Sequence, residues 1–77
     1  MNKSRRKELD KAIDLLYDAL MIVENVRSEE QDSFDNLPNS LQTSETGETL
    51  EDNANRLDDV YSFVEDQMNE LEDIKGN

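Results

Sequence analysis

Residues 33–53, with the sequence SFDNLPNSLQTSETGETLEDN, contain the chain's only proline and one of its two glycines. Pro38 disfavours helical geometry at the residue before it, so a helix is expected to end there. Ser44 followed by Glu45 is typical of the cap and first turn of a new helix, with Thr46 as the alternative cap. The stretch therefore predicts a bend between two helices.

Apolar residues before the bend recur at alternating intervals of four and three, which places them on one face of a helix, as in a coiled-coil seam. They are Leu9, Ile13, Leu16, Leu20 and Val23. The frame then passes through two polar residues, Arg27 and Glu30, and reaches Phe34 and Leu37. The first half of the chain therefore predicts one long amphipathic helix with a polar interruption.

The second half repeats the pattern with Leu50, Ala54, Leu57, Tyr61, Val64, Met68 and Leu71. Further apolar residues widen both stripes to the breadth of helices in a bundle; they are Ala12, Ala19, Val26, Val60 and Ile74. Two helices of about thirty residues, each roughly 45 Å long, match in length, and a short connection makes them antiparallel. We predict an all-α fold, a single domain over residues 1–77. Helix 4–36, bend 37–44 and helix 45–75 would form an antiparallel, coiled-coil-like two-helix hairpin.

Residues near the helix ends carry further expectations. Ser4 is expected to cap the first helix, although the basic residues after it suit a helix N-terminus poorly, and Gly76 is expected to end the last helix. Gly47 lies on the second seam, where its missing side chain would allow a close approach of the helices; a simple loop glycine is the alternative. Leu37 and Leu41 are expected to fold back over the end of the seam.

A two-helix hairpin has a thin core, and some large apolar residues fall outside both seams. These residues are Tyr17, Met21, Ile22 and Phe63. A second copy would cover this surplus, so we predict a homodimer that forms a four-helix bundle with these four residues at its interface. The alternative is that single exposed apolar residues are normal on a protein surface.

The chain has no cysteine and no histidine. These absences exclude disulfides and thiolate metal sites, and remove the usual general base and the commonest zinc ligand. The basic start, MNKSRRKELDK, leads into an amphipathic pattern, so no signal peptide is expected. No stretch approaches the roughly 18 to 20 apolar residues of a membrane span. We expect a cytoplasmic protein.

The formal net charge is −12, from 20 acidic and 8 basic residues, so direct binding to nucleic acid is not expected. Five bases lie within residues 3–11 and are expected to face acids near the end of the second helix; these acids are Glu65, Asp66, Glu70, Glu72 and Asp73. Residues 28–59 carry ten acids and only Arg56 as a base, a net of −9. This crowding costs stability, and a role in binding would explain it; a solvated face that confers solubility is the alternative.

No constellation for catalysis or for tight metal binding is found. Paired-carboxylate catalysis needs a concave pocket that separates two pKa values, which a two-helix rod lacks, so we expect no enzyme. The stretch from Asp32 to Asn36 lacks the ligand pattern and the glycine of a calcium loop, and there is no glycine-rich phosphate loop. Asp14 with Asp18, or the carboxylates around Glu48, would hold a divalent ion only loosely. We expect no cofactor and no metal site.

Two segments, RRKELDKAIDLL and EEQDSFDNLPNSLQTSETGETLEDNANRLDDV, together with the final acidic heptads, resemble small acidic proteins encoded by bacteriophages and bacterial mobile elements. That family's pattern runs from an acidic helix end through an aromatic residue, an N-L-P-x-S-L-Q bend and a Ser-Glu-x-Gly-Glu restart. The matching residues are Phe34, Asn36, Leu37, Pro38, Ser40, Leu41, Gln42, Ser44, Glu45, Gly47 and Glu48. The resemblance covers nearly the whole chain, and its bend is the distinctive part. It implies a phage or mobile-element origin and a helical hairpin, and it brings no assigned activity.

Such a distinctive bend is more than a change of direction requires, since many short polar loops connect two helices. We therefore expect a non-enzymatic protein of the host-cell cytoplasm that binds and inhibits a host protein through its acidic surface, as a nucleic-acid mimic or anti-defence inhibitor does. The expected partner-binding residues are Glu29, Glu30, Asp32, Asp35, Glu45, Glu48, Glu51 and Asp52. The alternatives are a structural or assembly protein that acts through self-association, and a dimer that binds a small ligand between its helices.

Overall fold

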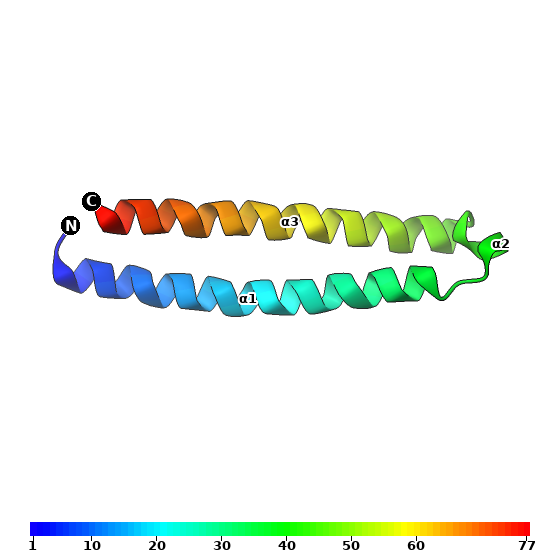
Figure 1. The fold of residues 1–77 in the computed structure, drawn as a ribbon, viewed down its shortest axis with the longest axis horizontal. Helices are drawn as coiled ribbons and strands as arrows, with labels where there is room; N and C mark the ends of the chain where they lie inside the picture. Colours follow the sequence, from blue (N-terminus) through cyan, green and yellow to red (C-terminus); the bar gives the residue numbers. More distant parts are fainter.

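The computed structural model describes the whole chain, Met1–Asn77. It contains three helices and no strand: α1 (Lys3–Asp35), α2 (Asn39–Gln42) and α3 (Glu45–Gly76). The helices α1 and α3 lie antiparallel in a rod of 58 × 15 × 12 Å, with both termini at one end and α2 at the other (Figure 1). The predicted all-α helical hairpin is confirmed. Neither long helix contains a segment that is both long and apolar enough to cross a membrane.

The first helix begins one residue earlier than predicted. Its N-cap is Asn2, whose side-chain oxygen accepts a hydrogen bond from the backbone N–H of Arg5 at 2.8 Å, so the expected cap at Ser4 is wrong. Asparagine and serine cap helices about equally well, and the chain uses the earlier of the two. The helix ends at Asp35, with Asn36 as its C-cap, one residue before the predicted end.

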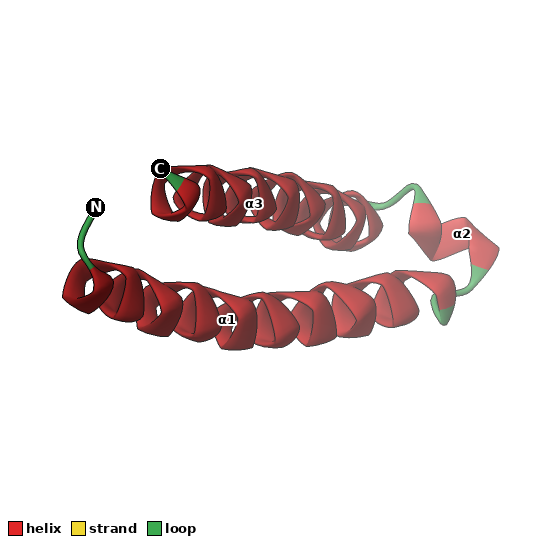
Figure 2. Cartoon of the chain, turned by 60° about the vertical axis from the view of Figure 1, so that its left-hand side comes forward, coloured by secondary structure: helices red, strands yellow, loops and turns green.

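The predicted bend contains a short helix, α2. The carbonyl oxygen of Pro38 accepts hydrogen bonds from the backbone N–H groups of Leu41 at 2.8 Å and Gln42 at 3.2 Å. The side-chain amide of Gln42 donates to the carbonyl oxygens of Phe34 at 3.4 Å and Leu37 at 3.3 Å. These bonds tie α2 to the last turn of α1, and α2 closes the end of the hairpin (Figure 2).

The predicted start of α3 is confirmed. The hydroxyl of Ser44 accepts a hydrogen bond from the backbone N–H of Gly47 at 3.3 Å and donates to the carbonyl oxygen of Leu41. Gly47 is buried because the end of α2 lies against it: a Cβ atom there would lie 2.5 Å from the carbonyl oxygen of Leu41. The close approach at Gly47 therefore joins α3 to α2 rather than to α1.

The final helix ends at Gly76, as expected, but this glycine is its last helical residue and does not follow the helix. Asn77 is the C-cap, and its N–H donates to the carbonyl oxygen of Ile74 at 3.1 Å. Neither glycine of the chain has a positive φ, so Gly76 does not adopt the left-handed conformation with which glycines commonly end helices.

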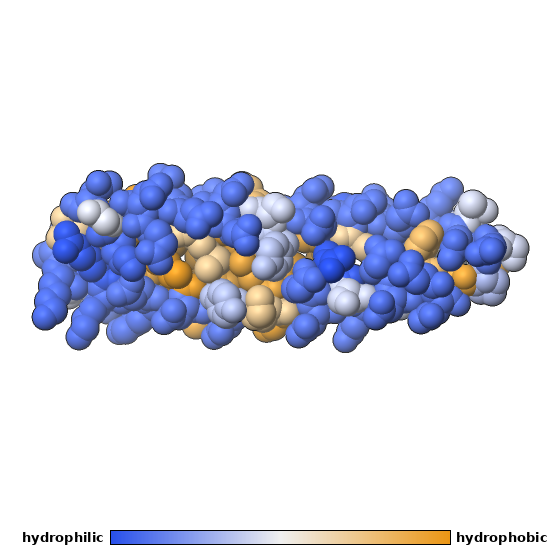
Figure 3. Space-filling view, in the orientation of Figure 1, coloured by the Kyte–Doolittle hydropathy of each residue, from blue (hydrophilic) through white to orange (hydrophobic).

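The core is a single row of side chains along the two predicted seams. All the seam positions are half-buried or buried, but Leu20 and Ala54, at 3% and 2% exposure, are the only buried apolar side chains. Leu37 is half-buried. Leu41 was expected to cover the end of the seam, but it is 47% exposed and does not. On the face drawn in Figure 3, apolar atoms show mainly along the line where the helices meet.

Candidate functional site

The eight expected partner-binding residues lie around the bend, and we call them the acidic collar; all except Glu30 are exposed. Glu30 lies on the α1 seam, where its carboxylate accepts a hydrogen bond from the side-chain amide of Asn53 at 3.1 Å. This carboxylate belongs to the contact between α1 and α3, so we leave it out of the candidate surface. The exposed members of the collar are Glu29, Asp32, Asp35, Glu45, Glu48, Glu51 and Asp52.

The structure brings only part of this collar together. Glu48, Glu51 and Asp52 border, with Asn55, a shallow hollow of about 190 Å³ on α3. Of the other exposed members, three lie on α1, and one lies in the first turn of α3, where the helix dipole favours an acid. No three acidic side chains are arranged to hold a metal ion.

The basic segment 3–11 does not pair with the acids of α3, contrary to expectation. Its one ion pair, made by Lys11, lies within α1. The ion pair between helices instead joins Lys75 of α3 to Asp10 of α1 at 2.6 Å, and Lys75 also contacts Glu72 at 3.0 Å. Hydrogen bonds to Asp10 and then Glu72 raise the pKa of Lys75. Exposed basic side chains gain little from any particular partner, so sequence position alone did not determine the pairing.

Exposed acids, most of them without an ion pair, form a row along α3. Adjacent acidic residues recur every seven positions, which places them along one edge of the helix. We call this set the acidic row; it consists of Glu51, Asp52, Asp58, Asp59, Glu65, Asp66, Glu72 and Asp73, and every member is exposed. The seven-residue repeat of acidic pairs is the sequence signal for this row. It was missed because the acids near the end of α3 were expected to be neutralised by the basic segment.

Few cations compensate the acidic row. Arg56 lies 3.9 Å from Asp52, and Lys75 contacts Glu72; the other six members form no ion pair. The row spans 22 residue steps, or roughly 33 Å at about 1.5 Å per residue. Its eight charges occur in adjacent pairs with a mean axial spacing of roughly 4.7 Å, against about 3.4 Å between phosphates on one DNA strand.

The two broad faces of the hairpin are defined by the neighbours of the seam residues. Each residue turns the helix by about 100°, so residues one position before and one position after a seam residue lie on opposite faces. Val26 of α1 lines one groove with Asn53 and Val60 of α3, and each of these residues comes one position before a seam residue. The positions before the seam residues of the two helices therefore share one face of the hairpin. Glu51 and Asp58 come one position after seam residues. The acidic row therefore lies along the opposite face and the outer edge of α3.

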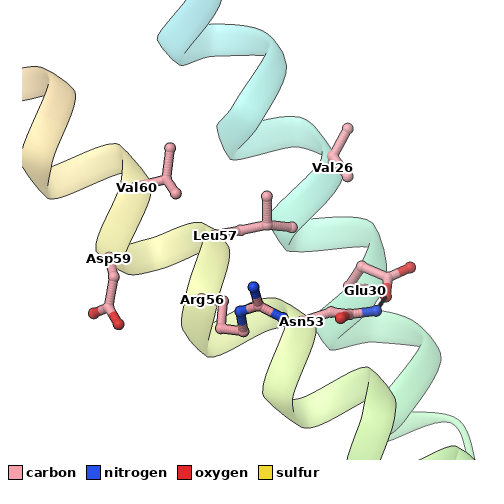
Figure 4. A pocket seen from close by; sticks show the side chains of 7 residues that line it. All are labelled: Val26, Glu30, Asn53, Arg56, Leu57, Asp59 and Val60. Carbon is pink, nitrogen blue, oxygen red and sulfur yellow. Dashed lines mark hydrogen bonds between the residues drawn. The ribbon is translucent and has the colours of Figure 1, made fainter.

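The groove between Val26 and Val60 has a volume of about 530 Å³. Its lining consists of Val26, Glu30, Asn53, Arg56, Leu57, Asp59 and Val60 (Figure 4). Within this groove, the side chain of Leu57 points toward α1, whereas that of Asp59 points away from α1 (Figure 4). Its two valines continue into a larger apolar surface.

We call this surface the apolar face; it consists of Leu15, Ala19, Ile22, Val26, Val60 and Phe63, each one position before a seam residue. Leu15, Ile22 and Phe63 are 70%, 65% and 64% exposed. The four residues predicted at a dimer interface are thus divided: Ile22 and Phe63 lie on this face, while Tyr17 and Met21 follow seam residues and lie on the opposite one. Sequence reasoning missed Leu15, although its position directly before Leu16 marked it.

Arg27, one of the two polar residues in the α1 seam, forms its hydrogen bonds within the hairpin. The guanidinium of Arg27 donates two hydrogen bonds to the carboxylate of Glu24, from Nε at 3.0 Å and from Nη2 at 2.6 Å. This contact lowers the pKa of Glu24 and raises that of Arg27, to which the charge of Asp58 also contributes. Arg27 is therefore a structural residue of the seam.

Comparison with protein-family models, with curated proteins and with solved structures finds no match. The resemblance to small phage and mobile-element proteins stays a prediction, and the candidate surfaces rest on the geometry of this chain.

Proposed function

We propose that this chain is a non-enzymatic protein of a phage or mobile element that inhibits a host protein by occupying its nucleic-acid-binding surface. The acidic row carries the proposal. It offers eight exposed carboxylates along one edge of a helix, at a mean charge spacing of roughly 4.7 Å, which is of the same order as the spacing of about 3.4 Å on a DNA strand. The row extends the predicted collar, with which it shares Glu51 and Asp52.

The physical basis is electrostatic complementarity to a basic groove. A row of like charges attracts an oppositely charged surface over a distance, which speeds encounter and weakens as salt screens the charges. Grooves that follow a nucleic-acid backbone are lined by basic side chains. Because the row is built on a helix that is already folded, little ordering cost opposes binding.

A capture experiment with matched variants tests this function. The row variant carries Asp58→Asn, Asp59→Asn and Glu65→Gln, and the control variant carries Asp14→Asn, Asp18→Asn and Glu70→Gln. Both lose the same number of exposed acids of the same types. Each protein is immobilised, incubated with bacterial lysate and eluted with a salt gradient.

We expect the unmodified chain and the control variant to retain nucleic-acid-binding proteins that elute at matching salt concentrations. The row variant should release them at lower salt, and duplex DNA should displace them. If both variants elute identically, or if DNA does not compete, the acidic row is not a nucleic-acid mimic.

A structural or assembly protein that acts through self-association is the second candidate. The exposure of Ile22 and Phe63, at 65% and 64%, favours it. In that case, changes on the apolar face would remove the function, whereas changes in the acidic row would leave it intact.

A further inference from the structure

The hairpin leaves more large apolar side chains exposed than it buries. Leu20 and Ala54 are its buried apolar residues, whereas the three largest residues of the apolar face are each more than half exposed. A contiguous exposed apolar surface marks an interaction site. Chains of this size commonly gain stability from association with a second copy.

The α1 part of the apolar face has the spacing of a second helix-packing seam. Leu15, Ala19, Ile22 and Val26 are separated by steps of four, three and four, and Ala12 extends the series by a step of three. This alternation is the one with which α1 packs against α3. The helix thus has two seams, and α3 covers one of them.

This second seam is complementary to itself. It is centred on Ala19, so when two copies of α1 are aligned antiparallel, each Ala19 faces its equivalent. Leu15 then faces Ile22 of the second copy, and the small Ala12 faces the larger Val26. The paired alanines allow close approach at the centre, and the contact obeys two-fold symmetry.

Charge selects the antiparallel orientation. The basic segment 3–11 lies at the open end of the rod, and residues 28–59 at the bend end carry a net charge of −9. Antiparallel stacking places the basic segment of one copy beside the acids at the end of the other copy's α1, whereas parallel stacking would bring two acidic bends together. On α3, the positions on this face include one acid, Glu70, and one base, Arg56, so they add no net charge.

We infer that the apolar face binds a second copy of this chain in the antiparallel orientation, so that two hairpins form a four-helix bundle. This inference is independent of the proposed function, because the acidic row, apart from Asp59 beside the groove, lies on the opposite face and outer edge. The dimer presents two such rows to solvent. Tyr17 and Met21 lie outside its interface.

Sedimentation equilibrium over a range of concentrations tests the interface. The unmodified chain should approach twice its mass of 8.9 kDa. Ile22→Glu should weaken the dimer by roughly 30-fold or more, because it buries a charge at the contact. Met21→Glu, the adjacent position on the opposite face, is the matched control and should leave the dimer intact.

Circular dichroism verifies that both variants remain helical. If the unmodified chain stays monomeric, or if Met21→Glu disrupts association as much as Ile22→Glu does, the inferred interface is wrong.

A single introduced thiol tests the orientation, since the chain has no cysteine. In the antiparallel dimer the two copies of Ala19→Cys meet at the two-fold axis, and oxidation with diamide, which takes up the two hydrogens of the thiols, should link them as a disulfide. Asn25→Cys, exposed on the outer edge of α1, should remain unlinked. A parallel dimer places Ala19 against α3 of the second copy, so a dimer that Ala19→Cys fails to link overturns the antiparallel arrangement.

Discussion

The carboxylate of Glu30 accepts a hydrogen bond from the side-chain amide of Asn53 at 3.1 Å, across 23 residues of sequence. The contact between Lys75 and Asp10 is the other side-chain hydrogen bond between α1 and α3, and it lies at the far end of the rod. Polar pairs within an apolar seam commonly specify register, because sliding the helices leaves them without a partner. These two bonds therefore favour the same alignment of α1 and α3 that the apolar seams produce.

Loss of the Glu30 bond should lower stability by a measurable amount. Asn53→Ala is compared with Asn55→Ala, an exposed position two residues later on the same helix that forms no hydrogen bond to α1. Both changes raise helix propensity equally, so their difference isolates the bond. We expect Asn53→Ala to be less stable than Asn55→Ala by about 1 kcal/mol in urea unfolding followed by circular dichroism. Equal stabilities would show that the bond contributes nothing.

The positions of the seam were predictable from sequence because the three-four spacing of apolar residues is a property of the helix itself. The same frame passes through Arg27 and Glu30, which are half-buried, although Glu30 was expected on the partner-binding surface. The short helix α2 was not predictable, since four residues carry little intrinsic helical signal. It depends on tertiary contacts, such as the hydrogen bonds from Gln42 to the end of α1.

The candidate surfaces were only partly predictable, for a different reason. Ile22 and Phe63 were predicted to lie outside the seams, together with Tyr17 and Met21. The two pairs lie on opposite faces of the hairpin, because the first pair precedes seam residues and the second pair follows them. The acidic row was not predicted, because the basic segment 3–11 was expected to form ion pairs with the acids near the end of α3. Surface ion pairs depend on the rotamers of long side chains and on small energies, so proximity in a predicted register does not establish them.

Gly47→Ala should destabilise the hairpin, although alanine is normally the better helix residue by about 1 kcal/mol. The added methyl group would collide with the backbone carbonyl oxygens of Gln42 and Leu41, which cannot move without shifting α2. We expect a net loss of roughly 1–3 kcal/mol in the free energy of unfolding. Gly76→Ala is the control, because it meets no atom within 4 Å and should leave stability unchanged or slightly raised. A stabilising effect at Gly47 would show that α2 is loosely held.

The contact between Glu24 and Arg27 should make part of the stability dependent on pH. The folded-state pKa of Glu24 is lowered from 4.5, chiefly by its hydrogen bond to Arg27. Its contribution is therefore present above pH 4.5 and is lost as the pH falls through the lower folded-state value. Glu24→Gln should be less stable than the unmodified chain near pH 7, and the difference should vanish in acid. Thermal unfolding across this range measures it, and a difference that persists unchanged at low pH would contradict the assignment.

Leu20→Ala and Leu15→Ala separate the folded core of the hairpin from the apolar face. Leu20 is 3% exposed on the seam, so its truncation should cost about 2–4 kcal/mol at every protein concentration. Leu15 is 70% exposed in the single hairpin, and its truncation should cost little in dilute solution. If a second copy covers it, the difference in melting temperature between Leu15→Ala and the unmodified chain must grow as concentration favours the dimer. If this difference in melting temperature stays constant over about a hundredfold range of protein concentration, Leu15 lies outside any contact between copies.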